Sequence, residues 1–273
     1  MFHNRIIYIP GGSSGIGLAA AKQLAAKGAH VVIFARNPSR LESAHAEISE
    51  CKTDSRQRFG ATSVDVADPH LTTEAMNAAA NEFGAPDVLI NMAGQSEPRY
   101  ADRISHAQFD RIIKTNLYGT WNTISALLPH MKAKGGHIVN TSSIAGFIGV
   151  FGYADYCASK FAVVGLSEAL RMELKPCGIR VSVLCPPDTD TPMLFDENKI
   201  KPPETKALSK RARVLSADAV ARGLLLGIAK NRFMIIPGFE GRVIDRMRRW
   251  APSLLMHFMD SSVRKMQKTI RNP

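Results

Sequence analysis

The chain has 273 residues, 45% of them apolar, which is long enough for one α/β domain and too apolar for a disordered protein. Its net charge is +11, and the segment from Lys230 onward alone carries ten lysines and arginines against three acidic residues. No zinc-finger spacing or aromatic RNA-binding pattern accompanies this charge, which argues against nucleic acid as a partner.

The four cysteines are scattered without C-x-x-C spacing, and no metal-ligand pattern is present, as expected in a reducing compartment. The sequence opens without a signal-peptide pattern, and no run reaches the roughly 18 apolar residues of a membrane span. We therefore expect a cytoplasmic protein without a metal site.

Short apolar strands and helical patterns alternate along the chain. Strands are expected at 5–9, 30–35, 62–66, 87–91, 136–141, 179–184 and 232–236. Helical patterns lie between them, one ending at Lys27 and the others at 39–51, 71–83, 106–116, 119–132, 156–175 and 216–230. This alternation predicts an α/β fold with a doubly wound, mostly parallel sheet of about seven strands and helices on both faces.

A glycine-rich turn lies between the first strand and the first helix. Glycines there allow a pyrophosphate to approach the backbone, and the helix N-terminus offers free N–H groups. The spacing is G-x-x-x-G-x-G, which is weak alone and strong in this context. We expect a dinucleotide to contact this turn through Gly11, Ser13, Ser14, Gly15, Ile16 and Gly17.

The second strand ends in Ala35, Arg36 and Asn37. NAD sites usually place an acidic residue here for the ribose 2′-OH, whereas a cation suits the 2′-phosphate of NADP. Arg36 is therefore expected to bind that phosphate or to stack on the adenine; the alternative is an ordinary surface arginine. Asp65 is expected to contact the adenine amino group or, equally, to cap a turn.

Further cofactor contacts are expected where later strands end. Asn91, Ala93 and Gly94 follow the fourth strand, and the small pair lets backbone lie against the cofactor. After the sixth strand come Pro186, Thr189 and Thr191, whose hydroxyls suit a nicotinamide carboxamide. The polar, weakly patterned stretch that follows predicts a mobile substrate flap over about residues 187–214.

Tyr156 and Lys160 are four residues apart on one expected helix face, and Ser143 precedes Tyr156 by thirteen residues. A nearby ammonium lowers the pKa of a phenol, and a serine hydroxyl can hydrogen-bond a carbonyl oxygen. These groups together can protonate an oxygen whose carbon receives a hydride. The alternative is a core tyrosine beside a solvated lysine. Asn116 interrupts a long helical region and is expected to distort it locally.

These motifs, in this order, resemble the short-chain dehydrogenase/reductase family over about residues 5–240. The resemblance implies that Tyr156 is the general acid, that Ser143 polarises the carbonyl, and that Lys160 holds the nicotinamide ribose and lowers the Tyr156 pKa. It also implies that Asn116 supports a water in a proton relay. Pro10 departs from the family's usual threonine, and Pro187 from its usual glycine.

A narrower resemblance follows the second departure. The stretch P-P-D-T-D-T-P at 186–192, together with 196–198 and 201–205, is similar to the 3-ketodihydrosphingosine reductases. The resemblance implies NADPH-dependent reduction of a long-chain ketone in sphingolipid synthesis. Eukaryotic members carry membrane-spanning segments that have no counterpart here.

Residues 241–273 form a basic tail with apolar residues at helical spacing on both sides of Pro252: Val243, Met247, Trp250, Met256, Met259, Val263, Met266 and Ile270. Such a segment suits an anionic membrane surface or, equally, packing on its own domain or on a partner subunit. A lipid-derived substrate favours peripheral membrane contact.

The sequence thus predicts an NADPH-dependent ketone reductase in one domain, residues 1–240. One alternative is the same chemistry on another ketone, such as a 3-oxoacyl chain or a steroid. A second alternative is a non-catalytic NADP-binding regulator, which the intact Asn116, Ser143, Tyr156 and Lys160 argue against. Family members often pair through the helices at 107–132 and 156–175, so we expect a homodimer or homotetramer.

Overall fold

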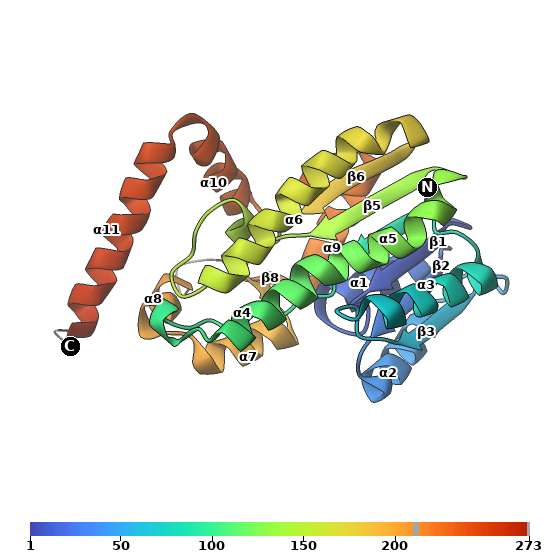
Figure 1. The fold of residues 1–273 in the computed structure, drawn as a ribbon, viewed down its shortest axis with the longest axis horizontal. Coiled ribbons are helices and arrows are strands. Elements are labelled where there is room, and N and C mark those ends of the chain that lie inside the picture. The colour runs from blue at the N-terminus through green and yellow to red at the C-terminus, as the bar shows by residue number, and fades with distance from the viewer. Residues whose placement is uncertain (210–212, 272–273) are drawn as a thin grey trace.

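A computed structural model describes residues 1–209 and 213–271 of the chain (Figure 1). Seven parallel strands form one sheet in the order β3-β2-β1-β4-β5-β6-β9. Their bounds are β1 Ile6–Pro10, β2 His30–Ala35, β3 Phe59–Ser63, β4 Val88–Asn91, β5 Gly136–Thr141, β6 Ile179–Leu184 and β9 Met234–Ile235. The order reverses between β1 and β4, which is where ligands bind in such sheets.

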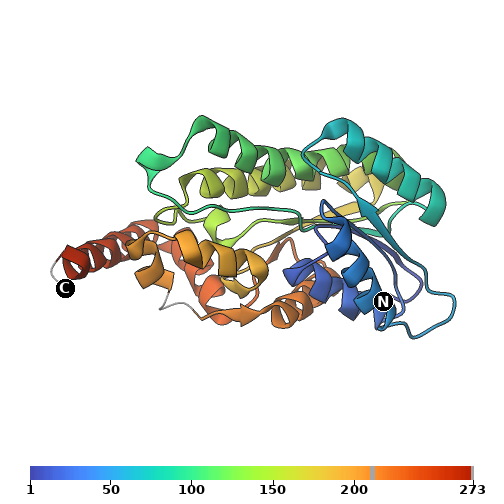
Figure 2. The same cartoon turned by 90° about the horizontal axis from the view of Figure 1, so that it is seen from below.

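Helices cover both faces of the sheet, as Figure 2 shows. On one face pack α1 (Gly15–Ala25), α2 (Pro38–Ser49) and α9 (Ala217–Ala229). The other face carries α3 Pro69–Phe83, α4 His106–Ile113, α5 Gly119–Lys132 and α6 Ala154–Glu173. The predicted fold class is therefore confirmed, and the paired strands of the described sheet are all parallel.

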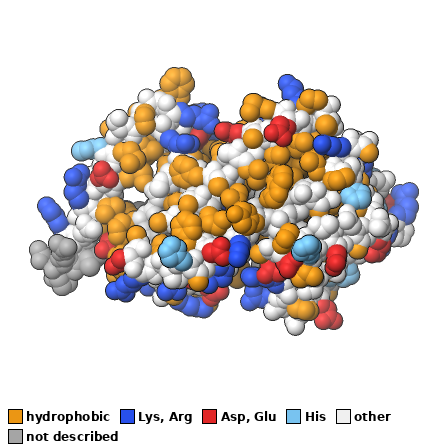
Figure 3. Space-filling view, viewed as in Figure 1, with side chains coloured by type: hydrophobic (Ala, Val, Ile, Leu, Met, Phe, Trp, Pro, Cys, Tyr) orange, Lys and Arg blue, Asp and Glu red, His pale blue; other side chains and the backbone are white. Residues whose placement is uncertain are grey.

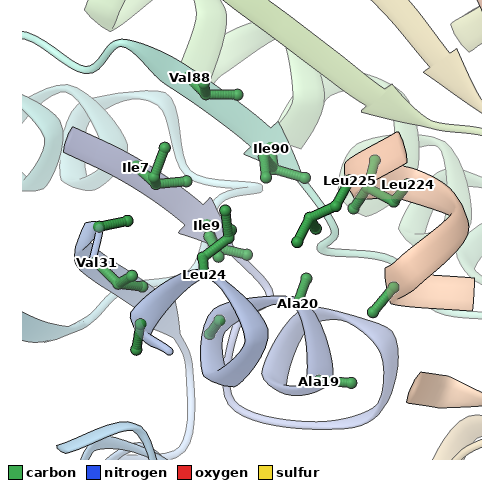
Figure 4. Packing of buried hydrophobic residues seen from close by; sticks show 14 of the residues in the cluster. Ile7, Ile9, Ala19, Ala20, Leu24, Val31, Val88, Ile90, Leu224 and Leu225 are labelled. Atoms are coloured by element: carbon green, nitrogen blue, oxygen red, sulfur yellow. The ribbon is translucent and has the colours of Figure 1, made fainter. Parts of the chain in front are cut away.

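Successive side chains of β1 point to opposite faces of the sheet, and each face has its own hydrophobic core. Ile7 and Ile9 pack with Leu24 of α1 and Leu224 of α9 on one face (Figure 4), whereas Tyr8 points to the other. Leu24 is fully buried, and removing such a side chain from water contributes roughly 1.5–3 kcal/mol. The two cores fix the positions of the strand ends, where the site described below is formed.

The third strand lies three residues earlier than the sequence predicts. Val64 and Val66, which led us to expect a strand at 62–66, follow β3 and pack from its exit loop beside Phe34 and Met76. They are buried because this loop crosses the end of the sheet next to α3. The last strand is also shorter than the predicted 232–236.

Most of the predicted flap is helical rather than irregular. It contains β7 (Thr189–Asp190), α7 (Pro192–Ile200) and α8 (Pro203–Ser209), and β7 pairs with β8 (Leu215–Ser216). Its positions 210–212 lie outside the described residues. The inward side chains of these helices, Glu197 and Thr205, are polar, so hydrophobic periodicity could not reveal them.

The tail forms two helices, α10 (Phe239–Trp250) and α11 (Pro252–Arg271), and Pro252 is the first residue of the second. On α11, Leu255 and Met266 are buried and the helix packs against α8, at the left in Figure 1. Trp250 is 87% exposed, and Leu254 and Met256 are also exposed. One face of α11 therefore packs on the domain, and another stays open. The side chain of Ile270 lies outside the described part.

The described part of the chain also has four short helical segments: η1 Ala101–Arg103, η2 Lys114–Tyr118, η3 Ile144–Gly146 and η4 Lys175–Cys177. Within residues 1–209 and 213–271, none of the helices is both long enough and apolar enough to span a bilayer.

Candidate active site

A cavity of about 920 Å³ opens at the carboxyl ends of the strands. Loops after β1, β2, β4, β5 and β6 line it, together with α7, α8 and α11. All but one of the predicted cofactor-binding residues lie in this lining: Gly11, Ser13, Ser14, Gly15, Ile16, Gly17, Arg36, Asn37, Asp65, Ala93, Gly94, Tyr156, Lys160, Pro186, Thr189 and Thr191. Ser143 lies there as well.

Asn91 is the exception. It is buried at the end of β4, and its side chain donates to Asn140 Oδ1 (2.9 Å) and accepts from Thr123 Oγ1 (2.7 Å). These bonds join β4 to β5 and α5 and leave the amide facing away from the cavity lining. Asn91 therefore braces the strand end from within the sheet.

The glycine turn is held close to the loop after β4. Gly11 has a φ of +84°, and a Cβ there would collide with the backbone of Ala93. Pro10 lacks an N–H but ends β1 in regular pairing, and its carbonyl accepts from Met92 N at 2.7 Å. Because Gly11 N donates to Phe34 O (2.7 Å), the turn stays anchored despite the proline.

The N-terminus of α1 fits a phosphate group. Ser14 is its N-cap residue, but the Ser14 side chain makes no capping hydrogen bond to the first turn. The first-turn N–H groups thus lie at the cavity wall without a side-chain acceptor, and such groups bind anions well. Gly94 gives a second close approach, since a Cβ there would lie 3.3 Å from Asn116 Oδ1. The residues present therefore fit a dinucleotide.

The end of β2 presents positive charge to the cavity. Arg36 and Arg40 both line it, and Ala35 occupies the position where an acid would bind a ribose 2′-OH. Arg36 Nη1 lies 3.8 Å from Asp65 Oδ2, with both side chains largely exposed. Asn37 caps α2 by accepting from Arg40 N at 3.0 Å. This arrangement can accept a phosphate on the adenosine ribose.

Ser143, Tyr156 and Lys160 come together at the end of β5. Ser143 caps η3, with its hydroxyl accepting from Ala145 N (3.1 Å), and hydrogen-bonds Tyr156. Lys160 is 3% exposed; its Nζ lies 5.5 Å from the centroid of the Tyr156 ring and donates to Thr141 O at 2.9 Å. The structure thus gathers three of the four predicted catalytic residues around one point in the cavity.

The helix is locally distorted at Asn116, as predicted: the chain is π-helical over η2, which contains this residue. Its side chain lies outside the cavity lining and is fully buried, accepting from Gln95 N (2.8 Å) and donating to Ser159 Oγ (3.0 Å). Its carbonyl accepts from Thr120 Oγ1 at 2.8 Å. Asn116 therefore ties the loop after β4 to α6, next to Lys160.

The expected lowering of the Tyr156 pKa is not found. Burial and then the negative charge of Glu197 raise the pKa of this phenol, and the hydrogen bond with Ser143 offsets only part of the rise. Burial also lowers the pKa of Lys160 to about 8. The Lys160 ammonium donates to Thr141 O and is not among the groups that shift the Tyr156 pKa.

Two groups of cavity residues escaped the sequence interpretation. Glu197, with Tyr153, forms a buried polar wall; the sequence placed Glu197 in a family-like motif at 196–198 but gave it no role in the site. From α11, Phe258, Met259 and Val263 form an apolar wall. The apolar period of this helix predicts a membrane or packing surface, whereas in the structure these three residues line the cavity.

Comparison with known proteins is consistent with this geometry. Residues 5–201 match the family described as short chain dehydrogenase. The chain is 34% identical over 243 residues, 88% of this chain, to "3-ketodihydrosphingosine reductase" of Mus musculus, and covers 73% of it. It is 36% identical over 191 residues to the 3-oxoacyl-[acyl-carrier-protein] reductase of Chlamydia muridarum, covering 70% of this chain and 76% of that one.

Among solved structures, levodione reductase superposes with a TM-score of 0.81 at 27% identity, over 89% of this chain and 99% of that one. A parallel sheet with a glycine turn and a Ser–Tyr–Lys group at its carboxyl edge defines a nucleotide-dependent oxidoreductase. The chain belongs to the short-chain dehydrogenase family. It is thus an oxidoreductase that works with a nicotinamide dinucleotide; the roles of its individual residues stay predictions.

Proposed function

We propose that the protein is an NADPH-dependent reductase of a long-chain ketone, with 3-ketodihydrosphingosine as its substrate. The observation that carries this proposal is the composition of the cavity. Tyr156 shares it with the apolar side chains Phe258, Met259 and Val263 of α11, which suit an alkyl chain. The mouse relative's name supports the same substrate.

The cofactor supplies a hydride to the carbonyl carbon. Ser143 and Tyr156 donate hydrogen bonds to the carbonyl oxygen, and Tyr156 gives up its proton as negative charge develops there. One such donor contributes roughly 3 kcal/mol to stabilising that charge. Burial and the charge of Glu197 raise the Tyr156 pKa, so the phenol carries its proton before the reaction begins.

The other predicted residues hold the cofactor and the reacting groups. The first turn of α1, with Ser13 and Ser14 before it, binds the pyrophosphate, and Arg36 binds the 2′-phosphate. Lys160 binds the nicotinamide ribose from its fixed position beside Thr141 O. Asn116 acts as a positioning residue between the loop after β4 and α6, and its carbonyl or amide supports the water of a proton relay.

An NADPH-oxidation assay against three ketones tests the substrate. We expect a long-chain 2-amino-3-ketone to give the highest kcat/KM, ahead of a 3-oxoacyl thioester and a steroid ketone. A preference for the thioester would favour the alternative that the Chlamydia relative suggests. If NADPH binds but none of the ketones is reduced, the proposal fails and the protein is a regulator.

We also propose that the protein is a homodimer or homotetramer joined through α4, α5 and α6. Apolar side chains gather on the face of the molecule seen in Figure 3. The large apolar residues exposed on these helices and on η2 are Phe109, Tyr118, Trp121, Phe161 and Met172. Single exposed apolar residues are normal on a monomeric protein, whereas several on neighbouring helices are typical of a protein–protein interface.

Trp121→Glu should dissociate the assembly, because it places a charge in an apolar interface, and sedimentation velocity would measure the loss of mass. Leu226→Glu is the control, since Leu226 is also an exposed apolar residue (61%, against 43% for Trp121) and lies on α9, on the opposite side of the sheet. A wild-type protein that sediments as a monomer would refute the proposal.

We propose, third, that the tail touches lipid through its open face. Trp250, the last residue of α10, and Leu254, in the first turn of α11, are both exposed, and Arg246 and Arg249 lie on α10 before Trp250. A basic residue near an anionic surface contributes about 1 kcal/mol, and salt weakens that attraction.

The double variant Trp250→Ser/Leu254→Ser should lose co-sedimentation with phosphatidylserine vesicles and still reduce a short soluble ketone. Deleting α11 would be a poorer test, because that helix also lines the cavity. Leu71→Ser, an exposed leucine on α3, is the control. Equal sedimentation of wild type and double variant at low salt would exclude this role.

A further inference from the structure

A buried carboxylate lies at the wall of the cavity. Glu197 is on α7, 8% exposed, and its Oε2 accepts a hydrogen bond from Tyr153 Oη at 2.8 Å. Lys201, one turn further along, places its Nζ 3.5 Å from the same oxygen. Thr191 caps α7 through Leu194 N, and this cap fixes the helix so that Glu197 turns inward.

The hydrogen-bonding capacity of this group is not filled. Both contacts are made to Oε2, so Oε1 is used by neither. Among the described residues, Lys201 Nζ finds no hydrogen-bond partner although it is buried, and it does not line the cavity. The buried hydroxyl of Ser96 lies near the carboxylate but outside hydrogen-bond geometry. A buried charge whose hydrogen bonds are incomplete destabilises the folded protein unless another group supplies the missing partner.

This carboxylate lies beside the reacting phenol. The Tyr153 ring, which holds Glu197, lies 5.8 Å between centroids from the Tyr156 ring. The negative charge of Glu197 is strong enough at Tyr156 to contribute to raising its pKa. A group bound to Oε1 would therefore lie close to the carbonyl that Tyr156 protonates.

Charge around the same part of the cavity has the opposite sign to the protein as a whole. The chain carries +11, yet away from Arg36 and Arg40 the described lining has Lys160 as its only basic side chain. Its acidic side chains there are Glu97, Asp188, Asp196, Glu197 and Glu240; of these, Glu97 is paired with Arg99 and Arg111, and Asp196 with Lys199. Such a site attracts a cationic ligand and repels a carboxylate.

We infer that Glu197 binds a primary ammonium group next to the substrate carbonyl, so that the enzyme selects long-chain α-aminoketones over neutral ketones of equal length. Tyr153 orients the carboxylate, and Lys201 offsets its charge from behind, away from the lining. This inference rests on the proposed function. The competing explanation is an ion pair that serves only to hold α7 in place.

The test compares kcat/KM for a long-chain 2-amino-3-ketone with kcat/KM for the same ketone without its amino group. Glu197→Gln should lower this ratio roughly 10- to 150-fold, the range of a charge-assisted hydrogen bond. Because this variant leaves the buried Lys201 uncompensated, Glu197→Gln/Lys201→Met, which removes both charges, should show the same fall. Its melting temperature reports folding.

Glu204→Gln is the matched control. Glu204 is on the neighbouring α8, accepts from the Tyr100 hydroxyl at 2.9 Å, and lies outside the cavity lining, so the ratio should not change. Calorimetry on wild type with NADP adds a measurement without any variant. A long-chain 2-amino-1,3-diol should bind about 10-fold or more tightly than the diol without nitrogen.

The outcomes separate this inference from the proposed function. If wild type reduces the aminoketone but the variants keep the wild-type ratio of kcat/KM values, Glu197 does not bind the ammonium group. Equal binding of the two diols would lead to the same conclusion. In either case the protein is still a ketone reductase. If wild type reduces neither long-chain ketone, the proposed function itself fails. A folded double variant with lost selectivity and wild-type stability excludes the purely structural ion pair.

Discussion

Tyr156→Phe should bind NADPH normally and lose ketone reduction by about 10²- to 10⁴-fold, the usual contribution of a general acid. The ring continues to pack beside Tyr153, and only the hydroxyl that hydrogen-bonds Ser143 is removed. Fluorescence titration measures cofactor affinity, and single-turnover kinetics with the long-chain ketone measures the chemical step.

Tyr8→Phe is the control for that experiment. Tyr8 is also buried, and its hydroxyl donates to Gly84 O at 2.9 Å, but it lies in the sheet away from the cavity lining. It should lose stability of about 1 kcal/mol and keep its turnover. Near-normal turnover in Tyr156→Phe would mean that another group delivers the proton, and the proposed mechanism would be wrong.

Arg36→Ala should weaken NADPH binding roughly 10- to 150-fold and change NADH binding far less, because only NADPH carries a phosphate to pair with the guanidinium. The residue lines the cavity where Ala35 leaves no competing carboxylate on β2. Its loose pairing with Asp65, at 3.8 Å, leaves it free to turn to a phosphate.

Arg58→Ala serves as the control, because Arg58 is a comparable exposed arginine that stacks on Phe83 away from the cavity. Isothermal titration with each cofactor gives both affinities. Equal affinity of the unmutated protein for NADH and NADPH would contradict the assigned role of Arg36, since no phosphate discrimination would then exist to lose.

Local patterns were enough to predict the fold and most of the cavity. The glycine turn, Arg36 and the Tyr156–Lys160 pair each follow directly from a strand or begin a helix, so their positions depend on the parallel sheet alone. Parallel strands bring their carboxyl ends to one edge, which is why residues up to 180 positions apart meet there. Asn91 also lies at a strand end, but its side chain bonds to Asn140 within the sheet and not to the cavity. The sequence does not show to which side the last residue of a strand points, so this orientation could not be predicted.

The substrate end of the cavity could not be predicted in this way. Glu197 and Thr205 face inward although they are polar, which is the reverse of the pattern that identifies a buried helix face. The wall formed by Met259 and Val263 depends on how α11 docks on α8, a long-range contact that the sequence alone does not specify. The raised Tyr156 pKa likewise could not be predicted, because it depends first on burial and then on the charge of Glu197, which is placed by the packing of α7.

Transfer of deuterium from NADPH labelled at both C4 positions to a long-chain 2-amino-3-ketone tests the central claim most directly. Mass spectrometry of the product should find one deuterium on the new carbinol carbon with wild type, and almost none with Tyr156→Phe over the same time. If the wild-type enzyme, saturated with labelled NADPH, leaves the ketone unreduced and forms no deuterated alcohol, the claim that this cavity reduces ketones is contradicted.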